Sequence, residues 1–369
     1  MVGTAHHYFA RGNTACGAHS LYDSAFQGVG KIYSLIGYPG TGKSLVIQRL
    51  ANEMMRSGKH VDLFHSPLNP DELDAMIITD LSVAVADERA CQGLESLSGS
   101  EIIRIDLGQA VDTALLSEES RAEIQSLHNR LLESYSRAYD SFAAALRIHD
   151  EWESIYIARM DFQKADQIAQ ELATCLLDNS MEDKKATSRH LFFGAATPKG
   201  AVDHIQTITA DLKTRIFVKG RPGSGKSTML KRLAVAAAGK GFDVDVFHCG
   251  FDPNSLDMLV FRELSLAIFD STAPHEYFPS RGGDEILDMY ELAMQPGTDE
   301  QYASEIESIK QRYSQKMREA TAFLRDAQEM DARHKAHYTA ITDFACVDRL
   351  GSQLQSEIEE LALNPRSIK

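Results

Sequence analysis

The chain has 369 residues, of which 43% are hydrophobic and 25% charged, a composition typical of globular proteins with two or three domains. The net charge of -15 disfavours nonspecific binding to nucleic acid, which requires clustered Lys and Arg, and no apolar run is long enough to span a membrane. The N-terminal residues lack the apolar core of a secretory signal, and the five cysteines never form a C-x-x-C pair. We therefore expect a cytoplasmic protein with free thiols.

The sequence contains an internal duplication. A shift of 183 residues aligns positions 7–87 with positions 190–270 without a gap and gives 26 identities in 81 positions. The matches fall in blocks, such as GYPGTGKS with GRPGSGKS and VDLFH with VDVFH. We expect two similar domains, 1–183 and 184–369, packed about a pseudo-twofold axis, with the boundary in the polar segment Met181–Ser188.

Hydrophobic patterns predict the same elements in each copy. In the first copy, strands are expected at 32–36, 61–65, 75–78 and 83–87, with a helix at 43–56. The second copy repeats them as strands at 216–219, 244–248, 258–261 and 266–270 and a helix at 226–239. The alternation of strands and helices predicts an α/β fold with a parallel sheet in each copy.

A helical region follows each of these cores. Residues 117–179 and 299–363 contain almost no Gly or Pro and are rich in helix-forming residues, so each region predicts two or more long helices. The segments YSRAYDSFAAALR and YSQKMREATAFLR correspond between the copies. We expect a helical subdomain packed on each core. The alternative is a coiled-coil arm that binds a protein partner.

Both copies carry the motif G-x-x-x-x-G-K-[ST] between a predicted strand and a predicted helix. Its glycines allow positive φ angles, so consecutive backbone N–H groups can surround a phosphate at the positive end of the following helix. In such a P-loop the lysine reaches the β- and γ-phosphates and the serine coordinates magnesium. The predicted nucleotide-binding residues are Gly37, Gly40, Thr41, Gly42, Lys43, Ser44 and Leu45, and Gly220, Gly223, Ser224, Gly225, Lys226, Ser227 and Thr228.

A P-loop needs a second acidic anchor for magnesium at the end of a neighbouring strand. Asp87 and Asp270 fit this role because each closes an apolar strand at the same distance from its lysine; a structural strand end is the alternative. Glu88 is a candidate base for activating water, and the second copy has Ser271 there, so we expect unequal turnover at the two sites. The predicted metal ligands are Ser44, Asp87, Ser227 and Asp270, and the predicted catalytic residues are Lys43, Asp87, Glu88, Lys226 and Asp270.

Other retained residues leave a second interpretation open. The retained pairs are His7 and His190, His65 and His248, and Arg49 and Arg232. We expect the histidines to be structural. A small-molecule kinase could instead use those at 65 and 248 with Asp74 and Asp257 as an acceptor site, under a lid that contains Arg281. The arginines are expected on a solvated helix face, with contact to phosphate or to the other half as the alternative.

The two loops, together with the stretches HCGFDPNSLD, IFDSTAPHEYFP and IHDEWESIYIARMDFQKAD, resemble a bacterial family of duplicated P-loop ATP-binding proteins. The resemblance covers nearly the whole chain and implies ATP and Mg2+ as ligands. The leading hypothesis is an ATPase that acts as a conformational switch with two unequal sites. The alternatives are a small-molecule kinase and a nucleotide-binding scaffold without turnover.

Overall fold

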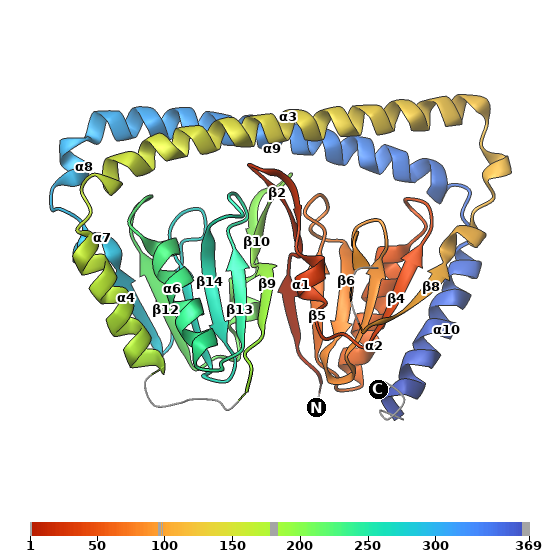
Figure 1. Ribbon diagram of the computed structural model, residues 1–369. Coiled ribbons are helices and arrows are strands. Elements are labelled where there is room, and N and C mark those ends of the chain that lie inside the picture. Colours follow the sequence, from red (N-terminus) through yellow and green to blue (C-terminus); the bar gives the residue numbers. More distant parts are fainter. Residues whose placement is uncertain (1, 95–96, 98, 178–183, 364–369) are drawn as a thin grey trace.

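The computed structural model describes residues 2–94, 97, 99–177 and 184–363 and consists of two similar α/β halves beneath a pair of long helices (Figure 1). The first half contains β1 (Ala5–Tyr8), β2 (Arg11–Thr14), β3 (Gly17–Ser20), α1 (Tyr22–Ala25), β4 (Lys31–Ile36), α2 (Lys43–Arg56), β5 (Val61–His65), β6 (Leu73–Ile78), β7 (Val83–Asp87) and β8 (Glu101–Asp106). The second contains β9 (Ser188–Phe192), β10 (Gly194–Thr197), β11 (Gly200–Asp203), α5 (Ile205–Ile208), β12 (Thr214–Lys219), α6 (Lys226–Gly239), β13 (Val244–His248), β14 (Leu256–Phe261), β15 (Leu266–Asp270) and β16 (Asp284–Asp288). The expected tandem duplication is confirmed, and it extends through β8 and β16.

Each half is built on a six-stranded sheet, in the order β1-β5-β6-β7-β4-β8 and β16-β12-β15-β14-β13-β9. The α/β class is confirmed, but the prediction of parallel sheets is wrong because β6 and β14 run antiparallel to both of their neighbours. The connections on either side of β6 are short: Ser66 N donates to the Glu72 carbonyl before it, and Thr79–Leu81 forms one 3-10 turn after it. Such connections reverse the chain, whereas a parallel pair needs a long crossover.

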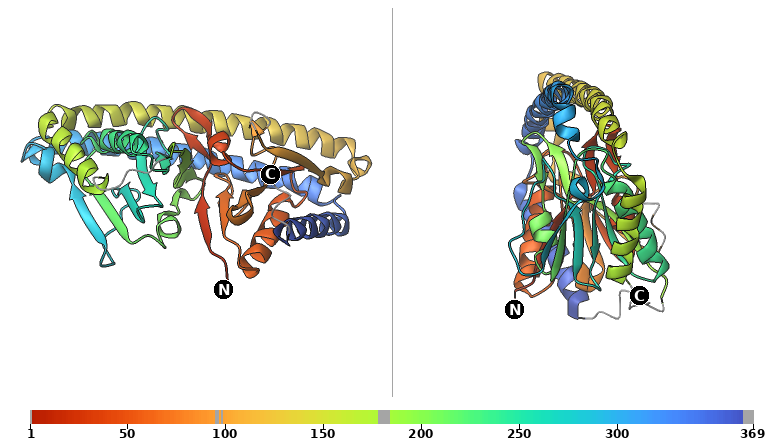
Figure 2. Two further views of the ribbon diagram at one scale, coloured as in Figure 1. Left: turned by 60° about the horizontal axis from the view of Figure 1, so that its bottom comes forward. Right: turned by 90° about the vertical axis from the view of Figure 1, so that its left-hand side faces the viewer.

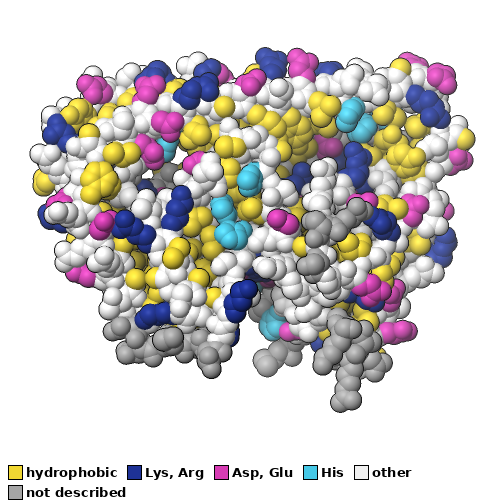
Figure 3. Space-filling model, viewed as in Figure 1, with side chains coloured by type: hydrophobic (Ala, Val, Ile, Leu, Met, Phe, Trp, Pro, Cys, Tyr) yellow, Lys and Arg dark blue, Asp and Glu magenta, His cyan; other side chains and the backbone are white. Residues whose placement is uncertain are grey.

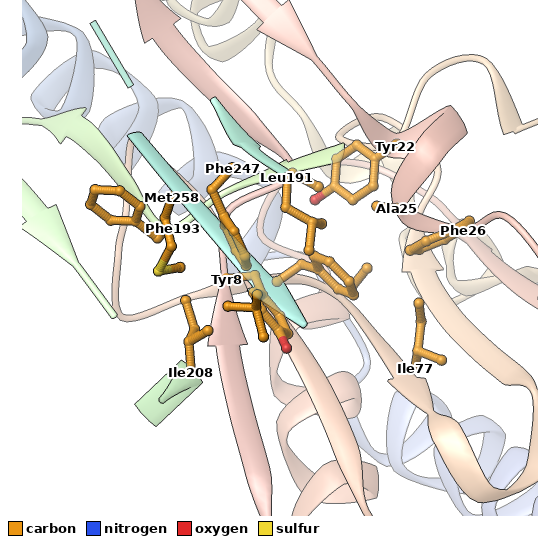
Figure 4. Packing of buried hydrophobic residues seen from close by; sticks show 14 of the residues in the cluster. Tyr8, Tyr22, Ala25, Phe26, Ile77, Leu191, Phe193, Ile208, Phe247 and Met258 are labelled. Atoms are coloured by element: carbon orange, nitrogen blue, oxygen red, sulfur yellow. The ribbon is translucent and has the colours of Figure 1, made fainter. Parts of the chain in front are cut away.

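The two halves meet along their edge strands. Phe9 and Phe192 occupy equivalent positions and exchange two backbone hydrogen bonds, with N···O distances of 3.0 and 2.9 Å. Buried aromatic side chains from both halves then form one continuous cluster, which includes Tyr8 and Phe26 from the first half and Phe193 and Phe247 from the second (Figure 4). The halves are therefore joined by a shared hydrophobic core.

The helical regions are exchanged between the halves. The first supplies α3 (Glu118–Ile157) and α4 (Phe162–Leu177), and the second supplies α7 (Met289–Ala293), α8 (Thr298–Gln301), α9 (Ala303–Thr339) and α10 (Phe344–Leu363). Ala169 and Leu177 of α4 belong to the core around α6, and Leu354 and Ile358 of α10 belong to the core around α2. We expected each helical region to pack on its preceding core, and this prediction is wrong. A long helix carries the chain across to the other half before the shorter helix packs.

The long helices α3 and α9 lie antiparallel along one edge of both sheets (Figures 1 and 2). Exposed ion pairs join them near both ends, between Glu151 and Arg312 at 2.7 Å and between Glu123 and Arg333 at 2.8 Å. Ala138, Phe142, Ala320 and Leu324 are buried where they cross the middle of the molecule. The predicted boundary segment Met181–Ser188 begins outside the described residues, which resume at residue 184. Within the described residues, no helix combines the length and apolar character that crossing a membrane requires.

Candidate functional site

The two glycine loops lie at equivalent positions, between β4 and α2 and between β12 and α6. Gly40 and Gly42 have φ angles of 79° and 83°, and Gly223 and Gly225 have φ angles of 72° and 82°. Other residue types are strained at such angles, so the glycines are what allows the loop to fold back over the start of the helix. In each copy the helix begins at the lysine, and its N-terminal N–H groups are directed at the loop.

Each loop lysine lies beside the aspartate of the neighbouring strand. Lys43 Nζ donates to the Gly37 carbonyl at 3.0 Å and is 3.4 Å from Asp87 Oδ1. Lys226 Nζ is likewise 3.5 Å from Asp270 Oδ2. Because β7 pairs directly with β4, and β15 with β12, the sequence prediction of an acidic side chain beside the loop agrees with the geometry. Burial raises the pKa of Asp87 and lowers that of Lys43.

The loop serines each bond to the start of the antiparallel strand. Ser44 Oγ accepts a hydrogen bond from Leu73 N at 2.8 Å, and Ser227 Oγ accepts one from Leu256 N at 2.9 Å. A hydroxyl oxygen has two lone pairs, so each serine keeps one for a metal ion.

The other predicted loop residues differ in their surroundings. Thr41 Oγ1 donates to the Tyr38 carbonyl at 2.9 Å, whereas the equivalent Ser224 hydroxyl is buried without a hydrogen-bond partner. The side chains of Leu45 and Thr228 are exposed, so their part in a nucleotide site is limited to their backbone groups.

Glu88 is directed away from the predicted catalytic position. Its carboxylate accepts from Ser34 Oγ at 2.7 Å and from Arg104 Nε at 3.1 Å. Ser34 alternates along β4 with Tyr33 and Leu35, which pack toward α2, and therefore lies on the opposite face of the sheet. The second half has Phe217 in place of Ser34. Two hydrogen bonds thus hold the carboxylate of Glu88 on the sheet face away from α2.

The end of a long helix from the opposite half covers each loop. The Tyr38 and Tyr338 rings are stacked with centroids 4.8 Å apart, and Thr339 Oγ1 is 3.1 Å from the Gly40 carbonyl oxygen. In the second half, a Cβ atom at Gly223 would lie 2.7 Å from the Glu153 carbonyl oxygen. Sequence reasoning missed these helix residues because it assigned each helical region to its own core.

The helix end over the first loop also borders a cleft. This cleft of about 500 Å3 lies between Asn69 and Glu72 on one side and Asp331, Lys335 and Thr339 on the other. Lys335 bonds to Glu72 at 2.7 Å and pairs with Asp331 at 2.9 Å. At the second loop, Glu153 takes the place of Lys335 in the contact with the loop glycine. The Lys335 side chain therefore borders the first site, whereas the contact of Glu153 with the second loop is made by its backbone.

The aspartate at the start of the antiparallel strand has an arginine partner in the first half only. Asp74 pairs with Arg11 at 2.6 Å. The residue equivalent to Arg11 is Gly194, so the equivalent aspartate, Asp257, has no such partner. Burial, together with the nearby charge of Asp270, raises the pKa of Asp257 to about 7. This difference arises from β2 and β10, which lie outside the loops, and alignment of the two copies at these positions could have revealed it.

The remaining retained residues serve the packing of the two halves. Arg49 of α2 forms an ion pair with Asp348 of α10, and Arg232 of α6 forms one with Asp166 of α4. Both side chains are at least half exposed, as expected for a solvated helix face, and each also contacts an exchanged helix. Arg281, the predicted lid residue, donates to two backbone carbonyls next to α5. No described hydrogen bond or ion pair connects Arg281 to a glycine loop.

The four retained histidines form two hydrogen-bonded pairs. His7 Nδ1 lies 2.7 Å from His65 Nε2, and His190 Nδ1 lies 2.8 Å from His248 Nε2. Histidine side chains gather on one face of the molecule where the halves meet (Figure 3). The expected structural role of these side chains agrees with their hydrogen bonds.

Comparisons with known proteins do not assign a function to this chain. Searches against protein-family models, curated proteins and solved structures give no match for this chain.

Proposed function

We propose that this protein is a magnesium-dependent ATPase with two non-equivalent sites, each of which communicates with the opposite half of the molecule. The observation that carries the proposal is the repeated arrangement at the two loops. In each, a glycine loop, the start of a helix, a lysine and the aspartate of an adjacent strand converge at one end of a sheet. This is the arrangement that surrounds the phosphates in nucleotide-binding loops.

The residues of each loop fit a nucleotide and its metal ion. Lys43 now donates to loop carbonyls, and in the proposed complex it turns to the phosphates. Ser44 has a free lone pair and lies on the helix that begins beside Asp87, so the two would hold Mg2+. Ser227 and Asp270 have the same roles in the second half. Mg2+ held by these residues would neutralise part of the negative charge of the nucleotide phosphates.

The covering helix ends support a role as a switch. A phosphate group bound at the first loop would compete for Lys43, which now donates to the Gly37 and Tyr38 carbonyls of the loop. In this loop, Tyr38 stacks on Tyr338 of α9, and the Gly40 carbonyl accepts a hydrogen bond from Thr339 of the same helix. The chain enters α9 from the opposite half. A ligand shifts a conformational equilibrium of a protein only by binding the two conformations with unequal affinity. Because the loop and the end of α9 are in contact, we propose that nucleotide affinity depends on the position of α9.

The two sites differ in their suitability for hydrolysis, and we propose that the second site turns over. Asp257, with a pKa of about 7 and next to Asp270, suits a general base near neutral pH. In the first half, Arg11 neutralises Asp74, and Glu88 is held by Ser34 and Arg104. The first site, bordered by Lys335, is then the site that retains nucleotide.

The test is to measure free phosphate and bound nucleotide with the wild-type chain and two variants, Lys43→Ala and Lys226→Ala. We expect about two molecules of a non-hydrolysable ATP analogue per chain for wild type and about one for each variant. Phosphate release should fall much further in Lys226→Ala. ADP formation that requires added metabolites would favour the kinase, and binding without turnover would favour the scaffold. Absence of nucleotide binding would contradict the proposal.

A further inference from the structure

The interface between the two halves brings three histidines together. His7 comes from β1, His65 ends β5, and His204 precedes α5 of the second half. Each offers a ring nitrogen, and these three atoms lie within 4.8 Å of one another. We propose a binding site here for a divalent transition-metal ion such as zinc. Its ligands would be His7 and His65 of the first half and His204 of the second. This site is independent of the proposed nucleotide sites.

The hydrogen bonds of His65 prepare it to act as a ligand. His65 Nδ1 lies 2.7 Å from the carbonyl oxygen of Pro70, which can only accept, so Nδ1 carries the proton. His65 Nε2 is therefore unprotonated and directed into the cluster. Metal-bound histidines characteristically donate their other N–H to a carbonyl or carboxylate, which fixes the ring orientation.

His204 supplies a second, independent observation in favour of a metal site. Its Nε2 atom is buried and has no hydrogen-bond partner in the structure. Its ring lies against Phe9, at 5.2 Å between centroids, and against His65, at 4.5 Å. A buried polar nitrogen without a partner is costly, and a metal ion would satisfy it.

The three rings are also in a suitable protonation state and close to a suitable geometry. Burial, together with the neighbouring imidazoles, lowers the pKa of His7 to about 4 and that of His204 to about 3, so both rings are neutral at pH 7. Two nitrogens bound to one tetrahedral zinc ion lie roughly 3.3 Å apart, from Zn–N distances of about 2.0–2.1 Å. The His7 and His65 nitrogens, now 2.7 Å apart, would have to separate by roughly 0.6 Å to reach this spacing. The proton on His7 Nδ1 moves to Nε2 of the same ring through solvent.

The second half provides an internal control. His190 and His248 repeat the hydrogen-bonded pair, and His248 Nδ1 lies 2.6 Å from the Pro253 carbonyl oxygen. The residue equivalent to His204 is Leu21, which packs in a small apolar cluster. This pair therefore lacks the histidine that the first pair receives at the equivalent position. Three imidazoles suit zinc, copper or nickel and leave a coordination position for water.

The test is titration of metal-free protein with Co2+, whose absorption bands report tetrahedral nitrogen coordination, followed by displacement with Zn2+, without nucleotide throughout. Wild type should bind one ion per chain. His204→Leu, which copies the tolerated residue of the second half, should weaken binding by at least about 100-fold, because loss of a ligand exceeds the 10–100-fold cost of losing a second-shell partner. The control His248→Leu should bind like wild type.

His7→Ala, on an edge strand, provides a second variant that should also lose binding. Zn2+ should raise the melting temperature of wild type and of His248→Leu but not that of His204→Leu or His7→Ala. The proposal is overturned if wild type binds no more tightly than His204→Leu, or if His248→Leu loses the ion as well.

Discussion

Gly40 provides a direct test of the contact between the first loop and the helix of the opposite half. A Cβ atom at this position would lie 2.5 Å from the Lys335 carbonyl oxygen and 2.6 Å from Thr339 Oγ1, and its three nearest neighbours all belong to α9. The φ angle of 79° adds strain for any L-residue. Gly17, with a φ of 91° and no atom within 4 Å of such a Cβ, has the same backbone strain without the contact.

The expected loss of stability has two contributions, the backbone strain and the contact of the added Cβ atom with α9. A left-handed conformation costs an L-residue about 1–2 kcal/mol, which applies to Gly17→Ala and to Gly40→Ala alike. Overpacking against α9 adds about 1–3 kcal/mol to Gly40→Ala alone. We expect Gly40→Ala to lower the free energy of unfolding by about 2–5 kcal/mol and Gly17→Ala by about 1–2 kcal/mol.

Urea unfolding measures both changes, and hydrogen exchange locates them. Gly40→Ala should speed exchange near Lys335 and Thr339, whereas Gly17→Ala should leave that helix end unchanged. Equal destabilisation by the two substitutions, with unchanged exchange at the end of α9, would refute the packing of this helix on the loop.

Three further predictions concern the differences between the two sites. Arg11→Ala should lower the free energy of unfolding, measured with urea, by about 3–5 kcal/mol because it leaves Asp74 buried without its cation. The double variant with Asp74→Ala should recover much of this loss. An equally unstable double variant would contradict the pairing. The pKa of Asp257 is raised to about 7, against 3.8 for the free side chain. Between pH 3.8 and pH 7 the folded protein therefore binds one more proton than the unfolded chain, and the stability that Asp257 contributes is lost as pH rises through 7. Asp257→Asn should flatten this decline in unfolding midpoints measured from pH 5 to pH 8, and an unchanged slope would exclude Asp257 as its cause. Lys43→Ala and Lys226→Ala should each remove one bound nucleotide but lower phosphate release unequally, and equal losses would argue against non-equivalent sites.

The local elements were predictable from the sequence. The predicted helices 43–56 and 226–239 coincide with α2 and α6, because apolar periodicity and the glycine loop mark their beginning. The predicted strands 83–87 and 266–270 coincide with β7 and β15. Strand direction was not predictable in the same way, since β6 is as apolar as its neighbours and only the short turns around it reverse the chain.

The hydrophobic pattern of the sequence could not predict which of the two cores each helical region packs on. An apolar helix face such as that of α10 fits either of two similar cores, and the length and direction of α9 decide which one it reaches. For the same reason the sequence did not place Tyr338 beside Tyr38. The contrast between Arg11 and Gly194 was present in the aligned copies, but its meaning required the buried aspartates to be located.

The most direct test of the account combines nucleotide binding with hydrogen exchange in the Lys226→Ala variant, which leaves only the first loop able to bind. On addition of a non-hydrolysable ATP analogue with Mg2+, we expect exchange to slow in residues 37–44. The end of α9 around residues 335–339, which belongs to the opposite half, should change together with that loop, while residues 153–157 of α3 remain unchanged. A response confined to the first loop, or one at the end of α3 instead, would contradict the proposal that each site acts through the helix that covers it.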